Sequence, residues 1–346
     1  MKILIISDAW HPQVNGVVRT YEYLNKTLEA QGHEVCVFGP AEFKYRFAMP
    51  GYKEIELVPM PYARLKRKIE NFAPDMIHIA TEGPLGWGAR KFCLRTGRKF
   101  TTSYHTQFPD YVARRLCYFI PCLYPVIHRL GVKMIRKFHA PSTAMLVTTK
   151  SMSDQLQQWG IKTPIFPFTR GIDTALFHPG KKKLFDDLTK PVALYVGRLA
   201  IEKNIEEFLS MPWQGSKVIV GHGPDKEMLQ KKYPSAYFVG KKFGEELADH
   251  YRSADVFVFP STTDTFGIVL IEALACGLPI AAHDAIGPRD VVVNDKLGAL
   301  DNNLEKAAEQ AMKKGCAQER HDYIKENYTW EKAAEQFLTA KYKTLE

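Results

Sequence analysis

Short apolar runs rich in β-branched residues alternate with amphipathic, helix-like stretches along this chain of 346 residues. Apolar runs separated by helices are typical of parallel strands that are buried on both faces. The pattern therefore predicts parallel sheets with crossover helices on either side. In the first half, the expected strands are Lys2–Ser7, Glu34–Phe38, Met76–Ala80, Lys99–His105 and Met145–Thr149, and helices are expected to begin at Gly16 and Pro84.

A second series of the same kind follows the lysine-rich stretch Gly180–Lys190. Its expected strands are Pro191–Val196, Lys217–Val220, Ala236–Val239, Val256–Phe259 and Pro279–Ala282. We predict an α/β protein with two Rossmann-like, doubly wound domains facing each other across a deep ligand-binding cleft. The first domain is expected to span residues 1–168 plus a returning C-terminal helix in 329–346. The second is expected to span 169–328, with a linker near 169–185.

Composition narrows the cellular setting. The six cysteines include no Cys-x-x-Cys pair and are interpreted as thiols in a reducing cytosol. The apolar N-terminal run is interpreted as a first strand and not as a signal peptide. The longest apolar stretch, Leu116–Ile127, is well short of the ~20 residues of a spanning helix. We therefore expect a cytoplasmic protein, and its net charge of +9 favours anionic partners.

The strongest local signal is the segment Phe259–Pro279, where a buried strand ends in a polar turn and a helix begins near Gly267. Backbone N–H groups at such a helix start can hold an anion. Asp264 precedes the helix and Glu272 lies about two turns into it, which separates their carboxylates by more than ~10 Å. That spacing suits the two ends of a sugar nucleotide. The alternative is a helix-capping Asp264 with a solvated Glu272.

A second signal follows the first strand of the second domain, in Tyr195–Asn204. Arg198 and Lys203 stand at the carboxyl end of that strand, where doubly wound sheets bind ligands, and together they could clamp a diphosphate. The alternative is a solvated helix start. Gly221-His222-Gly223-Pro224 is half of a dinucleotide fingerprint without its third glycine, so we interpret it as a turn.

Two segments of the first domain also end at the carboxyl edge of a predicted strand. In the loop Asp8–Arg19, Gly16 would let a phosphate approach the backbone closely, although the loop is equally explained as an ordinary turn. In Ser103–Gln107, His105 stands where groups facing the cleft are expected. A lone histidine is more often structural than catalytic, so that alternative stays open.

Taken together, these segments resemble glycosyltransferase family 4, which comprises retaining enzymes with the two-Rossmann "B" glycosyltransferase fold. The resemblance covers nearly the whole chain. Asp264-Thr265-Phe266-Gly267 and Arg170–Asp173 look like the branch with lipid mannosyltransferases and sulfoquinovosyl-diacylglycerol synthases. The family motifs occur in order at Asn15-Gly16, Gly197-Arg198, Glu202–Asn204, Gly221–Pro224, Ser253–Ser261 and Phe266–Pro279.

The resemblance implies individual roles. Glu272 corresponds to the carboxylate that binds the donor ribose, and Asp264 to the one that contacts the transferred sugar, where the family more often has glutamate. His105 corresponds to a histidine near the reacting carbon, so the expected catalytic residues are His105, Asp264, Arg198 and Lys203. The other expected donor contacts are Gly16 at a phosphate, Phe266, Gly267 and Ile268 through backbone amides, and Val239, Gly240 and Lys241 around the base.

The same resemblance implies transfer of a hexosyl group from a UDP- or GDP-sugar with retention of configuration, with no cofactor and no metal. The chain has no Asp-x-Asp motif that would bind Mg²⁺ or Mn²⁺. Cations and helix amides would then stabilise the departing diphosphate. The alternatives are a sugar-nucleotide epimerase of the same fold and a non-catalytic membrane- or nucleic-acid-binding relic.

The acceptor side is expected in the segment Tyr111–His139, which mixes aromatic and aliphatic residues with cations. Such a segment can lie on an anionic bilayer at the inner face of the membrane. The alternative is an ordinary helix with a basic face. A lipid or lipid-linked glycan is the expected acceptor, and nucleic acid is not expected because the basic residues are scattered. The residues assigned to the acceptor or membrane side are Asp8, Arg19, Arg114 and Arg115.

Overall fold

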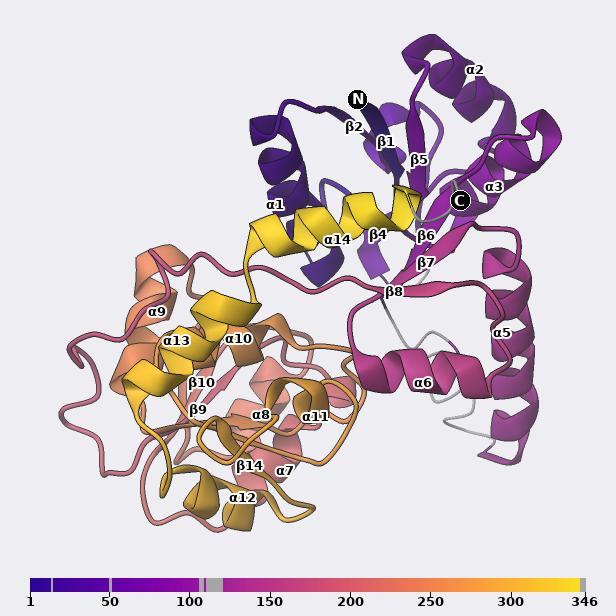
Figure 1. Cartoon of the computed structure of the whole chain (residues 1–346). Helices are drawn as coiled ribbons and strands as arrows, with labels where there is room; N and C mark the ends of the chain where they lie inside the picture. Colours follow the sequence, from indigo (N-terminus) through magenta and orange to yellow (C-terminus); the bar gives the residue numbers. More distant parts are fainter. Residues whose placement is uncertain (14, 50–51, 106–108, 110–120, 343–346) are drawn as a thin grey trace. The chain divides into compact units, whose positions relative to one another are not determined.

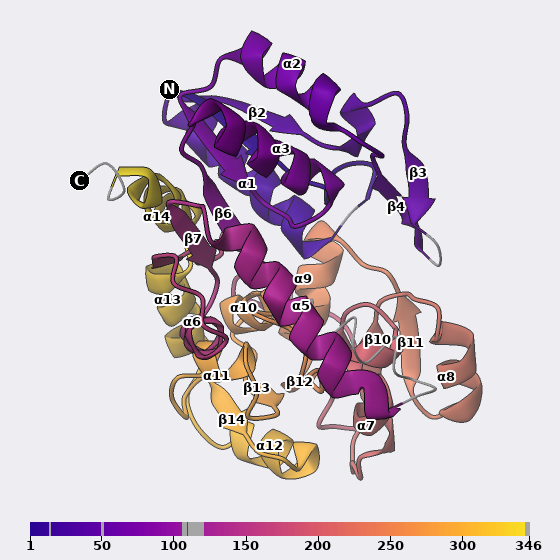
Figure 2. The ribbon, with the colours of Figure 1, turned by 90° about the vertical axis from the view of Figure 1, so that its right-hand side faces the viewer.

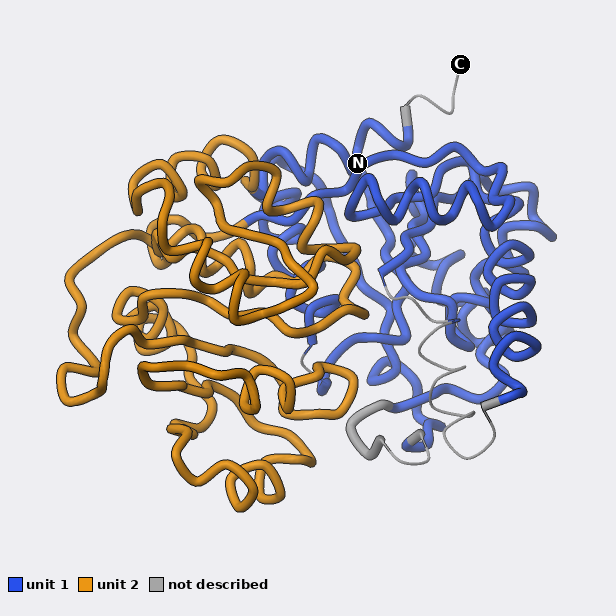
Figure 3. The backbone as a smooth tube through the Cα atoms, turned by 90° about the horizontal axis from the view of Figure 1, so that it is seen from below, with its two compact units in different colours: residues 1–171, 330–346 blue, residues 172–329 orange. Residues whose placement is uncertain are grey.

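The structure is a computed structural model that describes residues 1–13, 15–49, 52–105, 109 and 121–342. Two compact units are present (Figure 3): unit 1 is Met1–Gly171 with Trp330–Glu346, and unit 2 is Ile172–Thr329. The sequence had suggested boundaries after residues 168 and 328. Each unit contains a six-stranded parallel sheet with flanking helices (Figure 1). The predicted α/β class with two Rossmann-like sheets is confirmed.

The sheet of unit 1 has the strand order β2-β1-β5-β6-β7-β8. Its central strands are buried on both faces: Ile3 and Ile5 of β1 belong to one core cluster, and Leu4 and Ile6 to another. This period-2 alternation is what a doubly covered strand requires. The strands are β1 (Lys2–Ile6), β2 (Glu34–Phe38), β5 (Met76–Ile79), β6 (Thr101–Tyr104), β7 (Ala144–Val147) and β8 (Ile165–Pro167), and β3 (Phe47–Met49) pairs with β4 (Tyr52–Leu57) as a separate antiparallel ribbon.

Helices cover both faces of this sheet. One core cluster contains Tyr21 and Leu24 of α1 together with Ala333 and Phe337 of α14, so the C-terminal helix packs with the first helix of the chain. The small alanines of α14 allow this close approach. In the described part of unit 1, the helices are α1 (Gly16–Ala30), α2 (Tyr62–Phe72), α3 (Pro84–Thr96), α5 (Tyr124–His139), α6 (Lys150–Gln158) and α14 (Trp330–Tyr342), with short 3₁₀ turns at Pro40–Glu42 and Pro121–Leu123.

Unit 2 has the strand order β11-β10-β9-β12-β13-β14. The chain therefore begins in the middle of the sheet, runs to one edge, and returns to the other side of its first strand. The strands are β9 (Ala193–Val196), β10 (Lys217–Val220), β11 (Tyr237–Gly240), β12 (Val256–Phe259), β13 (Ile280–Ala282) and β14 (Gly298–Leu300). The helices are α7 (Ile205–Ser210), α8 (Lys226–Lys232), α9 (Gly244–Ser253), α10 (Ile268–Ala275), α11 (Pro288–Val291), α12 (Leu304–Ala311) and α13 (Ala317–Asn327), with a 3₁₀ turn η3 at Ile201–Lys203.

Strand order fixes where ligands are expected. The direction of strand addition reverses between β1 and β5 in unit 1 and between β9 and β12 in unit 2. Loops that leave the carboxyl ends of such neighbours diverge to opposite faces and leave a crevice at the sheet edge. The loops after β1, β5, β9 and β12 are therefore the first places to look for a site.

Four strands were not expected from the sequence. β8 and β14 have three residues each and pair on one side only, at sheet edges. β3 and β4 form the small ribbon outside the main sheet. Such short segments lack the continuous apolar run that marks a buried central strand.

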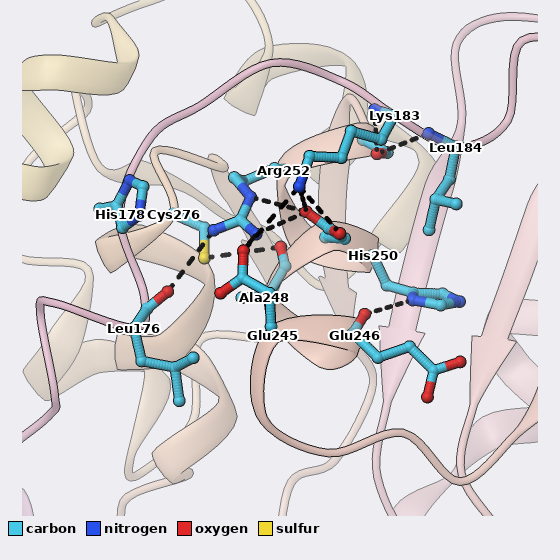
Figure 4. Close-up of polar contacts among 12 residues, drawn as sticks. Leu176, His178, Lys183, Leu184, Glu245, Glu246, Ala248, His250, Arg252 and Cys276 are labelled. Atoms are coloured by element: carbon cyan, nitrogen blue, oxygen red, sulfur yellow. Dashed lines mark hydrogen bonds and ion pairs between the residues drawn. The ribbon is translucent and has the colours of Figure 1, made fainter.

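The stretch expected to be a linker near 169–185 is largely docked on unit 2. Figure 4 shows its polar contacts around Arg252 of α9. The Arg252 guanidinium donates to the backbone oxygen of Leu176 at 3.5 Å, and the Ser253 hydroxyl accepts from the amide of Lys183 at 3.1 Å. The side chain of Arg252 is only 2% exposed, so the segment is hydrogen-bonded to a buried residue of unit 2. We therefore describe the segment as part of that unit.

Candidate functional site

The switch point of unit 2 brings together three of the residues predicted from the sequence. The loop after β9 carries Arg198 and Lys203, and the loop after β12 carries Asp264. The Lys203 ammonium donates to the Asp264 carboxylate at 2.6 Å, and the two side chains are 25% and 24% exposed. Arg198 is exposed. Two cations and a carboxylate therefore stand at the sheet edge where a doubly wound fold binds its ligand.

Further hydrogen bonds join these two loops. The Thr263 hydroxyl donates to the backbone oxygen of Glu202 at 3.1 Å, and the side-chain amide of Asn204 donates to the backbone oxygen of Pro260 at 3.4 Å. Asn204 has φ 52°, a left-handed conformation that asparagine tolerates better than most residues. The contact between Lys203 and Asp264 is thus supported on both sides of the ion pair.

The turn after β10 shapes the Arg198 loop. The Leu199 amide donates to the backbone oxygen of His222 at 3.0 Å. A Cβ atom on Gly221 would lie 1.8 Å from the Gly197 oxygen, and one on Gly223 would lie 2.1 Å from the Leu199 oxygen. Residues 221–223 are therefore packed backbone to backbone against the loop that carries Arg198, and only glycine fits at either position.

The helix that follows Asp264 begins at Ile268. Its N-cap is Gly267, at φ 79°, and no side chain caps it. The alternative in which Asp264 caps this helix is therefore wrong. Phe266 is buried, and its ring centroid lies 5.8 Å from that of Tyr328. This side chain therefore anchors the start of residues 266–268, whose backbone amides are the expected donor contacts.

Glu272 lies inside unit 2 and not on a solvated helix face. It is 4% exposed, and one carboxylate oxygen accepts a hydrogen bond from the Tyr251 hydroxyl at 2.8 Å. Tyr251 comes from α9, so two helices define the position of this carboxylate. The alternative of a solvated Glu272 is wrong, and its ribose-binding role stays a prediction.

The turn expected around the base lies at the carboxyl end of β11. Gly240 is the last residue of the strand, and its backbone oxygen accepts from the Gly221 amide at 2.9 Å. Val239 is half-buried and Lys241 is exposed. This turn is therefore hydrogen-bonded to the same glycine turn that supports the Arg198 loop.

In unit 1, His105 directly follows β6 and is held by both ring nitrogens. Its Nε2 lies 2.9 Å from the Tyr21 hydroxyl, and its Nδ1 lies 3.0 Å from Nη2 of Arg170. The Tyr21 hydroxyl also lies 3.0 Å from Ser103 Oγ and 2.8 Å from His78 Nε2. His105 is thus part of a polar network and not an isolated side chain.

Burial keeps the histidines of this network neutral. It lowers the pKa of His78 to about 3. Burial and the neighbouring Arg170 cation hold the pKa of His105 well below its usual range. Burial also lowers the pKa of Arg170, to about 10, which still leaves the guanidinium charged at neutral pH.

The loop after β1 is organised around Asp8. The Asp8 carboxylate is buried and accepts from the Leu85 and Gly86 amides at the start of α3, at 2.8 and 3.2 Å. Burial raises the pKa of Asp8 to about 6, and these hydrogen bonds oppose the rise. Asp8 thus holds the N-terminus of α3, and its predicted role toward an acceptor stays a prediction.

Gly16 and Arg19 lie in the first turn of α1. The Asn15 side chain caps this helix and accepts from the Val17 and Val18 amides at 2.9 and 3.0 Å. Gly16 is exposed and Arg19 is half-buried. The cap occupies two of the free amides of the first turn, so a phosphate contact at Gly16 would have to use the Gly16 amide.

Figure 2 shows helix α5 along its length. Its exposed side chains are both apolar and basic. Val126 and Leu130 are 55% and 60% exposed, and Arg129 and Lys133 beside them are exposed. A hollow of about 420 Å³ lies between this helix and the end of α6, and its lining includes Trp159. Within the described ranges, no helix is long and apolar enough to cross a membrane. Arg114 and Arg115 lie outside the described residues.

Three residues that the sequence did not single out complete these sites: Tyr21, Tyr251 and Arg170. Each is buried and contacts a residue that was singled out. Arg170 was noted only as part of a motif, and a tyrosine in an amphipathic helix carries no signal of its own. In the part of the chain that the structure describes, no three His, Cys, Asp or Glu side chains are grouped to hold a metal ion.

Known proteins share this arrangement. A family model described as Glycosyl transferases group 1 matches residues 179–330, and one described as Glycosyltransferase Family 4 matches residues 14–176. A GDP-mannose-dependent alpha-mannosyltransferase of Mycobacterium tuberculosis is 31% identical over 323 residues, which cover 87% of this chain and 83% of the relative. The chain belongs to glycosyltransferase family 4.

Two further relatives have names that refer to the transfer of a sugar group or to a glycolipid. An alpha-monoglucosyldiacylglycerol synthase of Acholeplasma laidlawii is 31% identical, with 81% of this chain and 79% of the relative covered. The sulfoquinovosyl transferase SQD2 of Arabidopsis thaliana is 28% identical, with 85% and 62% covered. The family and branch expected from the motifs are confirmed, and the chain is a glycosyltransferase acting on nucleotide sugars.

Solved structures agree on the fold. A sucrose-phosphate synthase from Thermosynechococcus elongatus has a TM-score of 0.76 at 22% identity, covering 99% of this chain and 98% of the other. The Anabaena protein HepE, solved with UDP and glucose, has a TM-score of 0.68 at 16% identity, covering 98% of each. The predicted B-type glycosyltransferase fold is confirmed.

Proposed function

We propose that this family 4 member transfers a hexosyl group from a GDP- or UDP-sugar to a lipid or lipid-linked glycan, with retention of configuration and without a metal ion. The observation that carries the proposal is the cluster of Arg198, Lys203 and Asp264 at the switch point of unit 2. Two cations beside a helix N-terminus are suited to a diphosphate, which is the leaving group of such a donor.

In this proposal, Arg198 and Lys203 bind the diphosphate and stabilise the charge that develops on it as the sugar leaves. Asp264 binds hydroxyls of the transferred sugar and Glu272 binds the ribose. The turn Val239–Lys241 contacts the base. The names of the relatives favour transfer over epimerisation, because the mannosyltransferase, SQD2 and the alpha-monoglucosyldiacylglycerol synthase are each named a transferase or a synthase.

Support for a lipid acceptor comes from two directions. One relative is named a synthase of alpha-monoglucosyldiacylglycerol, which is a glycolipid. In this chain, α5 combines exposed Val126 and Leu130 with exposed Arg129 and Lys133, the combination that binds anionic membrane surfaces. We propose peripheral contact with the cytoplasmic face of a membrane through this helix. That the two units face each other across a deep ligand-binding cleft stays a prediction.

Donor binding can be tested with the purified protein and a panel of GDP- and UDP-hexoses. A ligand at about 100 times its dissociation constant should stabilise the protein by ~2.7 kcal/mol, which a thermal-shift assay detects. The donor that binds is then incubated with lipid vesicles and EDTA, and the anomeric configuration of the product is read by NMR. A protein that responds to none of these donors would refute the proposed function. An EDTA-sensitive or inverted product would refute the metal-free or the retaining part alone.

Membrane contact needs a separate experiment. Flotation with vesicles that contain anionic lipid should recover the protein, and Arg129→Glu with Lys133→Glu should abolish recovery. The matched control is Lys313→Glu with Lys325→Glu, which reverses two exposed charges in unit 2. Equal loss in both double variants, or binding that is insensitive to salt, would contradict a specific role for α5.

A further inference from the structure

A continuous hydrogen-bond network lies near the carboxyl ends of β5 and β6 in unit 1. It links the Arg170 guanidinium to His105 at 3.0 Å, His105 to Tyr21 at 2.9 Å, and Tyr21 to Ser103 at 3.0 Å. Ser103 Oγ then lies 3.0 Å from His78 Nε2. Four of its five members are fully or almost fully buried, and His105 is half-buried.

Arg170, at one end of this network, sets which groups donate and which accept. A guanidinium has donors only, so His105 Nδ1 must accept from Arg170 and must carry no proton. The neutral imidazole then has its proton on Nε2 and donates to the Tyr21 oxygen. The Tyr21 hydroxyl, which accepts this bond, is left to donate to Ser103 Oγ at 3.0 Å or to His78 Nε2 at 2.8 Å. The direction of the bonds at His105 is the same in either case.

Arg170 is an unusual residue to bury for stability alone. It is 4% exposed, and its guanidinium lies 5.2 Å from the Phe168 ring. Among the residues that the structure describes, its Nη1 has no hydrogen-bond partner, and no carboxylate forms an ion pair with it. A buried cation without a carboxylate lowers stability, and such departures from good packing concentrate at functional sites.

We propose that Arg170 is a positioning residue for His105, which it fixes in one neutral tautomer with the proton on Nε2. The link to turnover rests on the proposed function, in which His105 lies near the reacting sugar. The tautomer itself does not rest on it. Among the residues that the structure describes, the titratable groups that act on His105 include Arg170, His78 and His139, with Tyr21 in direct contact.

The tautomer can be read directly from ¹⁵N shifts of the His105 ring in the wild-type protein. We expect an unprotonated Nδ1 and a protonated Nε2 throughout pH 6–8. In Arg170→Met, the ring should titrate about one pH unit higher or exchange between tautomers. Arg170→Lys, which keeps a donor and a cation, should retain the wild-type pattern. A protonated Nδ1 in the wild type, or an unchanged ring in Arg170→Met, would overturn the proposal, and neither result depends on transferase activity.

Kinetics then separate positioning from simple structural support. In Arg170→Met, the acid limb of the kcat profile should move upward by about one pH unit, so the loss relative to the wild type should be largest at the acid end of the profile, up to about tenfold, and should be absent at pH 8. The KM of the donor should change less than twofold. The control is Arg90→Met, which removes a half-buried guanidinium bonded to the Phe138 and Lys137 oxygens. A loss that is equal at every pH, or one that Arg90→Met reproduces, would overturn the link to turnover.

Discussion

The ammonium group of Lys203 lies 2.6 Å from a carboxylate oxygen of Asp264, and this contact joins the two loops that leave the switch point of unit 2. Both groups have proposed donor contacts, a diphosphate for Lys203 and a sugar for Asp264. In the ligand-free protein each therefore neutralises the other. The pair gives a direct test of the two roles, because the roles predict opposite effects on binding and turnover.

Asp264→Asn should leave the binding of UDP or GDP unchanged or up to about fivefold tighter, because a partly exposed ion pair that competes for Lys203 is worth ~1 kcal/mol or less. Turnover should fall by roughly 10- to 100-fold, the effect of losing one charged hydrogen bond of ~1.5–3 kcal/mol. Calorimetry with the free nucleotide and kcat with the full donor measure the two effects. Asp301→Asn is the control, since its partner Lys306 also lies at 2.6 Å on the surface of unit 2. Weaker nucleotide binding in Asp264→Asn would contradict the prediction that Asp264 and the diphosphate compete for Lys203.

Tyr251→Phe should weaken donor binding by about two- to tenfold, because it removes a hydrogen bond of ~0.5–1.5 kcal/mol that orients Glu272. Glu272→Gln should weaken binding further, since the carboxylate itself is lost. Tyr233→Phe is the matched control: its hydroxyl donates to Glu206 at 3.2 Å on the surface of the same unit. If Tyr251→Phe and Tyr233→Phe bind the donor equally well, Tyr251 does not position Glu272.

Gly223→Ala should displace the loop that carries Arg198, because the new methyl group would lie 2.1 Å from the Leu199 backbone oxygen. A backbone atom cannot move away from such a contact without a large cost in free energy. We expect a stability loss of ~1–3 kcal/mol and at least a tenfold loss of nucleotide affinity. Gly244→Ala is the control, since that glycine has φ 52° and open space around it. It should cost about 1 kcal/mol in stability and leave nucleotide affinity intact. Equal nucleotide affinities would show that the turn does not support Arg198.

The stability of unit 1 should fall on acidification because of His78, whose pKa burial lowers to about 3. Between pH 6.5 and 3 the unfolded chain binds a proton at this position and the folded one does not. The free energy of unfolding therefore falls by ~1.4 kcal/mol per pH unit as pH decreases through this window, and the His78 contribution is fully present above pH 6.5.

Urea titrations from pH 7 to 4 measure this slope. His78→Gln should reduce this slope by the contribution of one bound proton, ~1.4 kcal/mol per pH unit. The control is His178→Gln, which removes an exposed histidine, and the slope should fall less in it than in His78→Gln. Identical slopes in the wild type and His78→Gln would mean that His78 is not held neutral by burial.

Much of the fold could be predicted because buried parallel strands carry a strong local signal. The runs around Ile3–Ile6 and Val256–Phe259 are apolar at every position, as two-sided burial requires, and both are strands. The edge strand Gly298–Leu300 has no such run and escaped prediction. Arg198, Lys203 and Asp264 could be singled out because each follows an identifiable strand end, where the fold binds ligands.

What the sequence determined by itself was therefore local: the strands with continuous apolar runs, the residues at their carboxyl ends, and the family that those motifs identify. Only the tertiary structure decided which side chains meet. Lys203 and Asp264 are 61 positions apart, and Arg170 and His105 are 65 apart. Such contacts depend on strand order and helix packing, which bring together groups that no local pattern relates. The ion pair at the switch point and the orientation of His105 are properties of the fold and not of any one segment.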